Sequence, residues 1–232
     1  MRRLLTGITV SSLTLVLTAA APAGVVFSGD GSPADVGFVF DAAGGSGNIG
    51  DSFEFDTECS DPSTCAPQPG IMHEIGSAAN SGRWQLDVST VLNRAAGWFV
   101  EARLEILSHA GPGGILLVRD PSGGILVNLR DNEYEVGVTG GETVNVPISS
   151  GYHTLRLEMP AGGTRVNVLV DGGLFGSVLT DSSGPEFNFS DGNSSRALDA
   201  NWDYVAVNEE IPEPATLWLL GLGASMLLQR RR

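Results

Sequence analysis

Three carboxylates stand at alternate positions in the segment Glu54-Phe55-Asp56-Thr57-Glu58. In an extended strand, residues i, i+2 and i+4 point to one face, so this segment would line a cleft with three acidic groups. Paired carboxylates can cleave glycosidic bonds, one as general acid and the other as nucleophile or base. Glu54, Asp56 and Glu58 are therefore the candidate catalytic residues.

The same string resembles the E-x-D-x-E motif of laminarinase- and lichenase-type glycoside hydrolases. The resemblance implies Glu54 as nucleophile, Glu58 as acid/base and Asp56 as the residue that tunes them, with the outer carboxyls about 5 Å apart for retention. However, the string stands near the start of the mature chain, and Phe53 and Phe55 are the only aromatic residues beside it. We therefore expect a non-catalytic role and keep glycoside hydrolysis as the alternative.

Other catalytic constellations are absent from the sequence. It contains three histidines, no serine in a G-x-S-x-G elbow, no P-loop and no Rossmann fingerprint. The histidines are His73, His109 and His153. His153 alternates with apolar residues, which predicts a buried, hydrogen-bonded histidine rather than a general base.

The two cysteines, Cys59 and Cys65, enclose an Asp-Pro turn. In an oxidising compartment a close, even pair of cysteines forms a disulfide, so we expect a structural disulfide on a loop if the chain is exported. A metal centre would need further ligands at suitable spacing, and His73 alone does not supply them. We therefore expect neither a metal site nor a cofactor.

The net charge of −14 understates the acidity of the body. Without the five terminal arginines and Glu213, 8 basic residues face 26 acidic ones, a net charge near −18. Such a surface repels phosphate backbones, so nucleic acid is excluded as a partner. Its carboxylates could bind calcium, although keeping the domain soluble is the simpler explanation.

The body, residues 24–210, shows a period of two from end to end. In the segment 97–106, Trp98, Val100, Ala102, Leu104 and Ile106 share one face and polar residues the other, which predicts a half-buried antiparallel strand. The same pattern predicts strands at 152–159 and 165–171. Further strands are predicted at 36–41, 52–56, 84–88, 115–120, 125–130, 134–138, 143–148 and 202–207, with one helical turn at most at 87–94.

About a dozen short strands in one domain predict an all-β fold, an antiparallel two-sheet jelly-roll sandwich. Four segments resemble strands of concanavalin A-like lectin/glucanase (laminin G-like) domains, in the same order: Gly97–Arg103, Gly151–Leu157, Val168–Gly172 and Ala200–Val205. The resemblance implies a lectin-like module that associates with polysaccharide.

Residues 1–23 have the features of a secretory signal helix. Arg2 and Arg3 precede an apolar run, and small residues at Ala21 and Ala23 place the cleavage site after Ala23. An uncleaved N-terminal anchor is the alternative. The signal predicts an exported protein.

Residues 211–232 combine a Pro-Glu-Pro tripeptide, Pro212 to Pro214, with a short apolar helix at 215–228 and three terminal arginines, Arg230, Arg231 and Arg232. Positive charge stays in the cytoplasm, so the body would lie outside. The apolar stretch is shorter than the ~20 residues of a comfortable span, which suggests a transient anchor.

The order of these three parts resembles the PEP-CTERM sorting signal. The resemblance implies recognition by an exosortase-like membrane peptidase, cleavage near Pro-Glu-Pro, a transient inner-membrane anchor and delivery to the envelope or exopolysaccharide matrix of a Gram-negative bacterium. An ordinary single-pass anchor would give the same topology without release. We expect a non-catalytic lectin-like module, with a secreted glycoside hydrolase and a ligand-free matrix protein as alternatives.

Overall fold

The computed structural model of the chain describes residues 24–42, 49–61, 63–76, 82–111, 113–138, 141–182, 184–191 and 197–208. The predicted signal peptide with its cleavage site at Ala23, and the predicted sorting segment 211–232, lie outside these residues. None of the helices in the described part of the chain has the length and apolar character needed to cross a bilayer.

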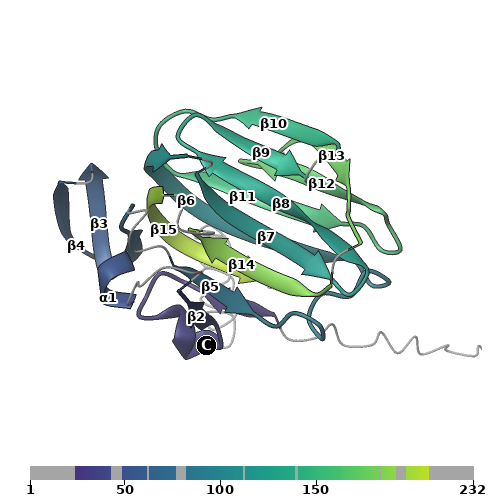
Figure 1. Cartoon of the computed structure of the whole chain (residues 1–232), viewed down its shortest axis with the longest axis horizontal. Coiled ribbons are helices and arrows are strands. Elements are labelled where there is room, and N and C mark those ends of the chain that lie inside the picture. The colour runs from purple at the N-terminus through teal and green to yellow at the C-terminus, as the bar shows by residue number, and fades with distance from the viewer. Residues whose placement is uncertain are drawn as a thin grey trace, which may run out of the picture.

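Eight antiparallel strands form the first sheet, sheet A. Seven lie in the order β13 (Gly173–Leu179), β12 (Arg165–Val170), β11 (His153–Met159), β6 (Trp98–Ala110), β15 (Ala197–Val207), β4 (Thr64–Glu74) and β3 (Phe53–Asp61). The eighth, β1 (Val25–Phe27), pairs with the end of β15. In Figure 1, β3 and β4 extend beyond the body of the sandwich.

Seven antiparallel strands form the second sheet, sheet B. Their order is β10 (Thr143–Pro147), β9 (Glu133–Gly137), β8 (Gly123–Arg130), β7 (Gly114–Asp120), β14 (Glu186–Ser190), β5 (Arg83–Leu86) and β2 (Val39–Asp41). The two sheets stack face to face (Figure 1). The predicted two-sheet antiparallel sandwich is confirmed.

The alternation in β6 determines which residues enter the core. Its five apolar positions from Trp98 to Ile106 are all buried, while the residues between them are partly exposed. β11 and β12 bury alternate residues in the same way, so the middle of sheet A faces sheet B through one continuous apolar layer. This pattern is the one predicted from the sequence.

An aromatic cluster fills the core beneath β14. Phe187 and Phe189 of this strand are fully buried, and Phe189 packs against Phe27, Phe38 and Trp202. β14 lies inside sheet B between β7 and β5. The sequence analysis predicted no strand here, because Glu186, Asn188 and Ser190 make the segment read as polar.

The N-terminal part of the sandwich departs further from the prediction. Residues 36–41 were expected to form one strand, but Pro33–Val36 form a 3₁₀ helix, η1, and only Val39–Asp41 form a strand. Ser32 caps η1 by accepting from Ala34 N at 3.2 Å, which ends the extended chain early. β1 and β4 were not predicted, and a single helical turn, α1 (Ile49–Ser52), precedes β3.

Glu74 of β4 is buried where the two sheets meet. Trp202 Nε1 donates to its Oε2 at 2.8 Å, while Ser190 Oγ lies within hydrogen-bond distance of both Glu74 Oε1 and the Gly82 carbonyl. A hydroxyl donates one proton only, so a protonated Glu74 that donates to Ser190 satisfies every group. Burial, with the charge of Asp191 adding to it, raises the pKa of Glu74 well above its ordinary value.

This raised pKa predicts a pH dependence of stability. The folded state holds a proton that the unfolded state releases near pH 4.5, so the free energy of unfolding should fall by about 1.4 kcal/mol per pH unit above that value, up to the folded pKa. Glu74→Gln should remove this fall, because the amide donates to Ser190 and accepts from Trp202 without titrating. Urea unfolding between pH 4 and 8 measures both slopes.

Glu142→Gln is the matched control. The Glu142 carboxyl is exposed, and its hydrogen bond from Arg165 lowers its pKa, so its contribution is lost only as the pH falls. The control should therefore leave the fall above pH 4.5 unchanged. Equal slopes in the wild type and Glu74→Gln would contradict a protonated Glu74.

Candidate functional site

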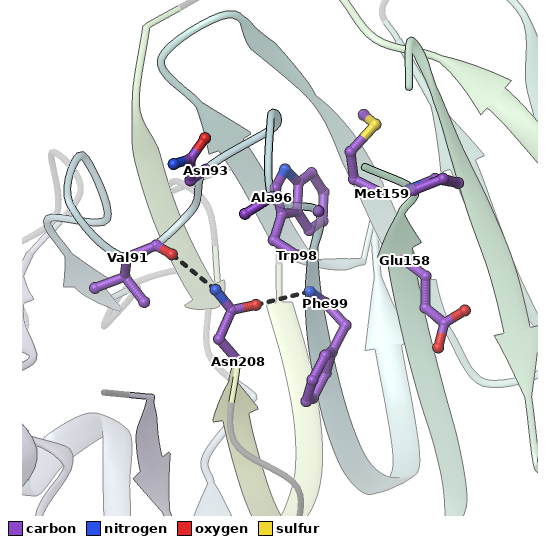
Figure 2. A pocket seen from close by; sticks show the side chains of 10 residues that line it. Val91, Asn93, Ala96, Trp98, Phe99, Glu158, Met159 and Asn208 are labelled. Carbon is purple, nitrogen blue, oxygen red and sulfur yellow. Dashed lines mark hydrogen bonds between the residues drawn. The ribbon is translucent and has the colours of Figure 1, made fainter. Parts of the chain in front are cut away.

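A pocket of about 440 Å³ opens where β6 begins and β11 and β15 end. Its wall is mostly apolar, with three polar side chains. Figure 2 shows that the lining residues come from three strands and from the loop that precedes β6. The lining residues are Val91, Asn93, Ala96, Gly97, Trp98, Phe99, Glu158, Met159, Pro160 and Asn208. Its volume lies within the range of small-molecule sites.

Asn208 ties the rim of the pocket together. Its side chain donates to the Val91 carbonyl at 2.7 Å and accepts from Phe99 N at 2.8 Å, as the dashed lines in Figure 2 show. The backbone of Asn208 is left-handed, with φ of 53°, a conformation that asparagine tolerates better than most residues. One side chain therefore joins β15, β6 and the 87–97 loop.

A buried ion pair between Arg94 and Asp120 also holds the 87–97 loop in place. Asp120 is fully buried and accepts from Trp98 Nε1 at 2.8 Å and from Arg94 Nε at 2.9 Å. Arg94 also donates to the Gly123 carbonyl and to the Thr180 hydroxyl. The pocket wall is thus anchored to both sheets, so the pocket is preorganised.

Beside the pocket, the outward-facing side chains of sheet A form a charged and aromatic surface, which we call the outer face. Arg156 of β11 donates to Glu101 at 3.1 Å and to Glu158 at 2.6 Å, and its guanidinium lies 3.8 Å from the centroid of the Phe99 ring. Phe99 and Glu158 belong to both the outer face and the pocket. The outer face comprises Phe99, Glu101, Arg103, Glu105, Tyr152, Arg156, Glu158 and Tyr204.

Two tyrosines complete the outer face. Tyr204 donates to Glu101 at 2.7 Å and Tyr152 donates to Glu58 at 2.8 Å. Burial, followed by these carboxylate hydrogen bonds, raises the pKa of both phenols, so both remain neutral donors. Arg103 pairs with Asp203 and lies over the Tyr152 ring. The face combines fixed donors, fixed acceptors and aromatic rings.

The three carboxylates of the 54–58 string do not share one face. Asp56 has a φ of 52° at a register shift between β3 and β4, so a β-bulge interrupts the alternation. The Glu54 carboxylate lies within 4.8 Å of Cys59 Sγ, whereas Glu58, the neighbour of Cys59 in the strand, points the opposite way to Tyr152. The expectation of a common face is therefore wrong. The bulge at Asp56 interrupts the alternation, and no signal in the sequence predicted the bulge.

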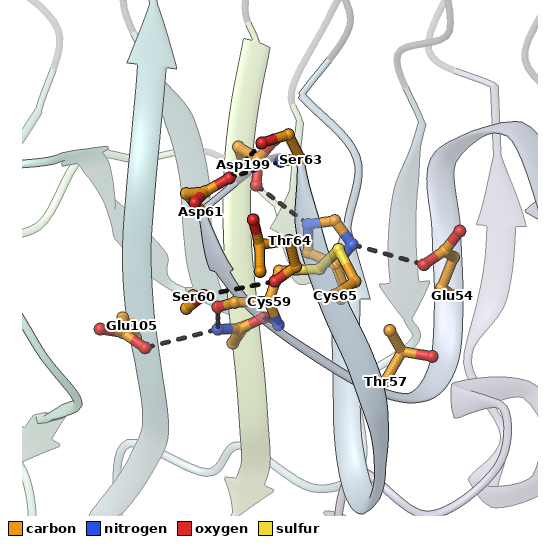
Figure 3. The surroundings of a disulfide bond; sticks show 12 residues. Glu54, Thr57, Cys59, Ser60, Asp61, Ser63, Thr64, Cys65, Glu105 and Asp199 are labelled. Atoms are coloured by element: carbon orange, nitrogen blue, oxygen red, sulfur yellow. Dashed lines mark hydrogen bonds and ion pairs between the residues drawn. A yellow bond between two sulfur atoms is a disulfide. The ribbon is translucent and has the colours of Figure 1, made fainter.

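The predicted Cys59–Cys65 disulfide is confirmed. Contrary to the expectation of a loop, the two cysteines are directly opposed residues of β3 and β4. The side-chain amide of Asn201 accepts from Cys59 N at 3.0 Å and donates to the Cys59 carbonyl at 2.7 Å, which fastens the hairpin to β15 (Figure 3). Glu105 of β6 lies beside the same amide.

All three histidines lie next to carboxylates, His109 next to Asp131 at 3.0 Å, and the sequence only partly predicted the surroundings of the other two. His153 is hydrogen-bonded to Asp171 at 2.7 Å and to Ser149, but it lies at the rim of β11 rather than in the core. His73 is buried, with Nε2 2.9 Å from Asp199 Oδ1 and Nδ1 3.8 Å from Glu54 Oε2. The sequence analysis treated His73 as a lone ligand and missed its strand-pairing partner, Glu54.

A family model described as the PEP-CTERM protein-sorting motif matches residues 210–232. The match confirms the motif predicted from the C-terminal residues and indicates an exported, envelope-associated protein. No curated protein matches the chain at a significant level.

Several solved structures are similar in fold. They include a carbohydrate esterase from the Shiga toxin-encoding bacteriophage phi24B, with a TM-score of 0.52, 11 % identity, and coverage of 79 % of this chain and 96 % of that one. A glycosyl hydrolase family protein from Mycobacterium fortuitum has a TM-score of 0.51, 16 % identity, and coverage of 78 % and 97 %. The Bacillus licheniformis beta-glucanase has a TM-score of 0.50, 12 % identity, and coverage of 82 % and 99 %.

These similarities confirm the predicted jelly-roll sandwich. At such identities they show the fold alone.

The role of Asn208 in the pocket is testable by mutation. Asn208→Ala removes two hydrogen bonds and places alanine in a left-handed conformation, so it should lower the free energy of unfolding by about 1–3 kcal/mol. Asn145→Ala, at an exposed position of β10, should change it little. Urea denaturation of both variants gives the comparison, and equal stabilities would contradict the bridging role.

Proposed function

We propose that this exported protein, which carries a PEP-CTERM sorting motif, is a non-catalytic lectin-like module that binds extracellular polysaccharide through the pocket and the adjoining outer face. The observation that carries the proposal is the continuity between the two. Phe99 and Glu158 line the pocket and also belong to the outer face. A polymer chain could therefore place one unit in the pocket and its neighbours along the face.

The chemistry of this surface suits a sugar. A pyranose has an apolar flank, which packs on aromatic rings, and hydroxyl groups, which pair with carboxylates, amides and guanidinium groups. The pocket supplies Phe99 for the first contact and Asn93, Glu158 and Asn208 for the second. Because the polar groups of the outer face already bond one another, their positions are fixed before a ligand arrives.

The charge of the domain favours a neutral polysaccharide. The body carries 26 acidic and 8 basic residues, and Arg103 and Arg156 are already paired with carboxylates. A polyanionic glycan would meet a repulsive field. We therefore expect binding to neutral polymers of the host's own exopolysaccharide matrix.

A secreted glycoside hydrolase that uses Glu54, Asp56 and Glu58 is the second candidate, favoured by the jelly-roll fold and by the string itself. The opposite directions of Glu54 and Glu58 favour the non-catalytic role, because cleavage needs two carboxyls that flank one bond. A ligand-free structural matrix protein is the third candidate.

The targeting part of the proposal follows from the sorting motif. An exosortase-like membrane peptidase would recognise Pro212-Glu213-Pro214 after the signal peptide is cut at Ala23. The apolar segment with Arg230, Arg231 and Arg232 would hold the chain transiently in the inner membrane of a Gram-negative bacterium. Comparison of the mass of the matrix-associated protein with that of the membrane-bound precursor tests this step.

Binding is tested by depletion of the purified protein from solution on a panel of insoluble polysaccharides, neutral and anionic, including the host exopolysaccharide. The wild type should be depleted by neutral polymers. Phe99→Ala should weaken binding about tenfold, the effect of losing roughly 1.4 kcal/mol of contact energy. Phe175→Ala is the matched control, because Phe175 is an exposed phenylalanine on β13 at the edge of the same sheet.

Reducing ends measured in the same tubes separate the candidates. The proposal expects no sugar release from any polymer. Release that disappears in Glu54→Gln would establish the hydrolase instead. The absence of both depletion and release would leave the structural matrix protein, and equal binding by Phe99→Ala and Phe175→Ala would place the ligand elsewhere.

A further inference from the structure

The disulfide lies inside a set of four metal-ligating side chains. One ligand atom from each of the four lies within 4.8 Å of the corresponding atom of every other: two sulfurs, one imidazole nitrogen and one carboxylate oxygen. The four residues are Glu54, Cys59, Cys65 and His73. They come from the paired strands β3 and β4, so the ladder holds them together.

The nitrogen of His73 that faces this set has no hydrogen-bond partner. Its side chain is only 4 % exposed, and Nδ1 is buried without a hydrogen bond. Its 3.8 Å ion-pair contact with Glu54 Oε2 is the dashed line that ends at Glu54 in Figure 3. A carboxylate only accepts, so the Nε2–H of His73 donates a hydrogen bond to Asp199 Oδ1 at 2.9 Å. In the neutral tautomer with the proton on Nε2, His73 presents the Nδ1 lone pair to the two sulfurs and the carboxylate, an orientation that is costly unless an ion binds it.

The contact with Asp199 has the form found behind metal-bound histidines. A ligating histidine donates its other N–H to a carboxylate, which fixes the ring orientation and makes the ligand nitrogen more basic. Asp199 lies on β15, the strand that pairs with β4, and is itself almost fully buried. His73 is thus held in place from behind by a strand that does not otherwise contribute ligands.

We propose that reduction of the Cys59–Cys65 disulfide converts these four residues into a tetrahedral zinc site. A dithiol reductant supplies two electrons and two protons, breaks the S–S bond and is oxidised to its own disulfide. Zn²⁺ then binds the two thiolates and displaces their two protons. His73 Nδ1 and one Glu54 oxygen complete the four ligands that structural zinc prefers.

The burial of the four residues allows such an exchange. Cys59 is fully buried, whereas Cys65 and Glu54 are exposed, so a reductant and a metal ion can approach from the Cys65 side. Asn201 holds the backbone of Cys59 through two hydrogen bonds that do not involve sulfur. These hydrogen bonds therefore keep the hairpin attached to β15 when the S–S bond opens. Either the disulfide or a bound zinc ion can then join β3 to β4 at this point.

Cobalt is the probe, because tetrahedral Co²⁺ with thiolate ligands absorbs in the visible and shows a thiolate-to-metal band in the near ultraviolet. The full chain is reduced with a phosphine, freed of reductant without air and titrated with Co²⁺ and then Zn²⁺. We expect one Co²⁺ per reduced chain with both bands, displacement by Zn²⁺, and no such bands in the oxidised chain. Bound Zn²⁺ should also slow the return of the disulfide in air.

Four variants test the individual roles. Cys65→Ser should abolish the thiolate spectrum of the site, and Glu54→Gln should weaken binding. Asp199→Asn should weaken it about 10–100-fold, the usual effect of removing a carboxylate behind a ligand histidine. Glu58→Gln is the matched control, because Glu58 lies on the same strand and points the other way.

A reduced chain that keeps its native circular dichroism and binds no Co²⁺ would overturn the proposal. So would a reduced chain that unfolds and does not refold when Zn²⁺ is added, or Co²⁺ binding that is equally tight in Glu54→Gln, Asp199→Asn and Glu58→Gln. Polysaccharide depletion by the oxidised protein is independent of these results, so the failure of either proposal can be recognised separately.

Discussion

The pairing of β15 with three other strands is the interaction on which the rest of the sandwich depends. β15 is joined to β6 along most of its length, to β4 near Trp202 and to β1 near its end. Asn201 and Trp202, adjacent in this strand, reach in opposite directions, one to the disulfide hairpin and the other to buried Glu74. Because β15 comes last in the body, sheet A gains its centre only when nearly all of the body is available, and such long-range pairings form slowly.

Much of the fold was predictable because most strands bury one face and alternate cleanly, as β6 does from Trp98 to Ile106. Prediction from the sequence failed for strands that are buried on both faces and for segments in which the backbone interrupts the alternation of buried and exposed residues. β14 is buried on almost every position, including Asn188 and Ser190, so its polar residues concealed an inner strand. The Ser32 cap and the bulge at Asp56 are local backbone features that have no period to detect.

The candidate site was less predictable than the fold, because its residues meet only through tertiary structure. Asn208 lies more than a hundred residues after Val91 and Phe99 in the sequence, and the pocket exists because the pairing of β6 with β15 brings them together. The three carboxylates of the Glu54–Glu58 string suggested a catalytic site, but the direction of each carboxylate depends on the left-handed backbone of Asp56. The spacing of the two cysteines in the sequence predicted their disulfide. Their proximity to Glu54 and His73 depends on the pairing register of β3 and β4, which the sequence does not show.

The position of the pocket relative to the sorting motif has a mechanical consequence. Asn208 forms part of the pocket wall, and Pro212 follows four residues later, a span of at most about 14 Å even for a fully extended chain. A membrane-held molecule would thus keep this end of the sandwich close to the bilayer and crowd out a large polymer. Release of the chain from the membrane would then also uncover the pocket, so that binding would begin only after release and not at export.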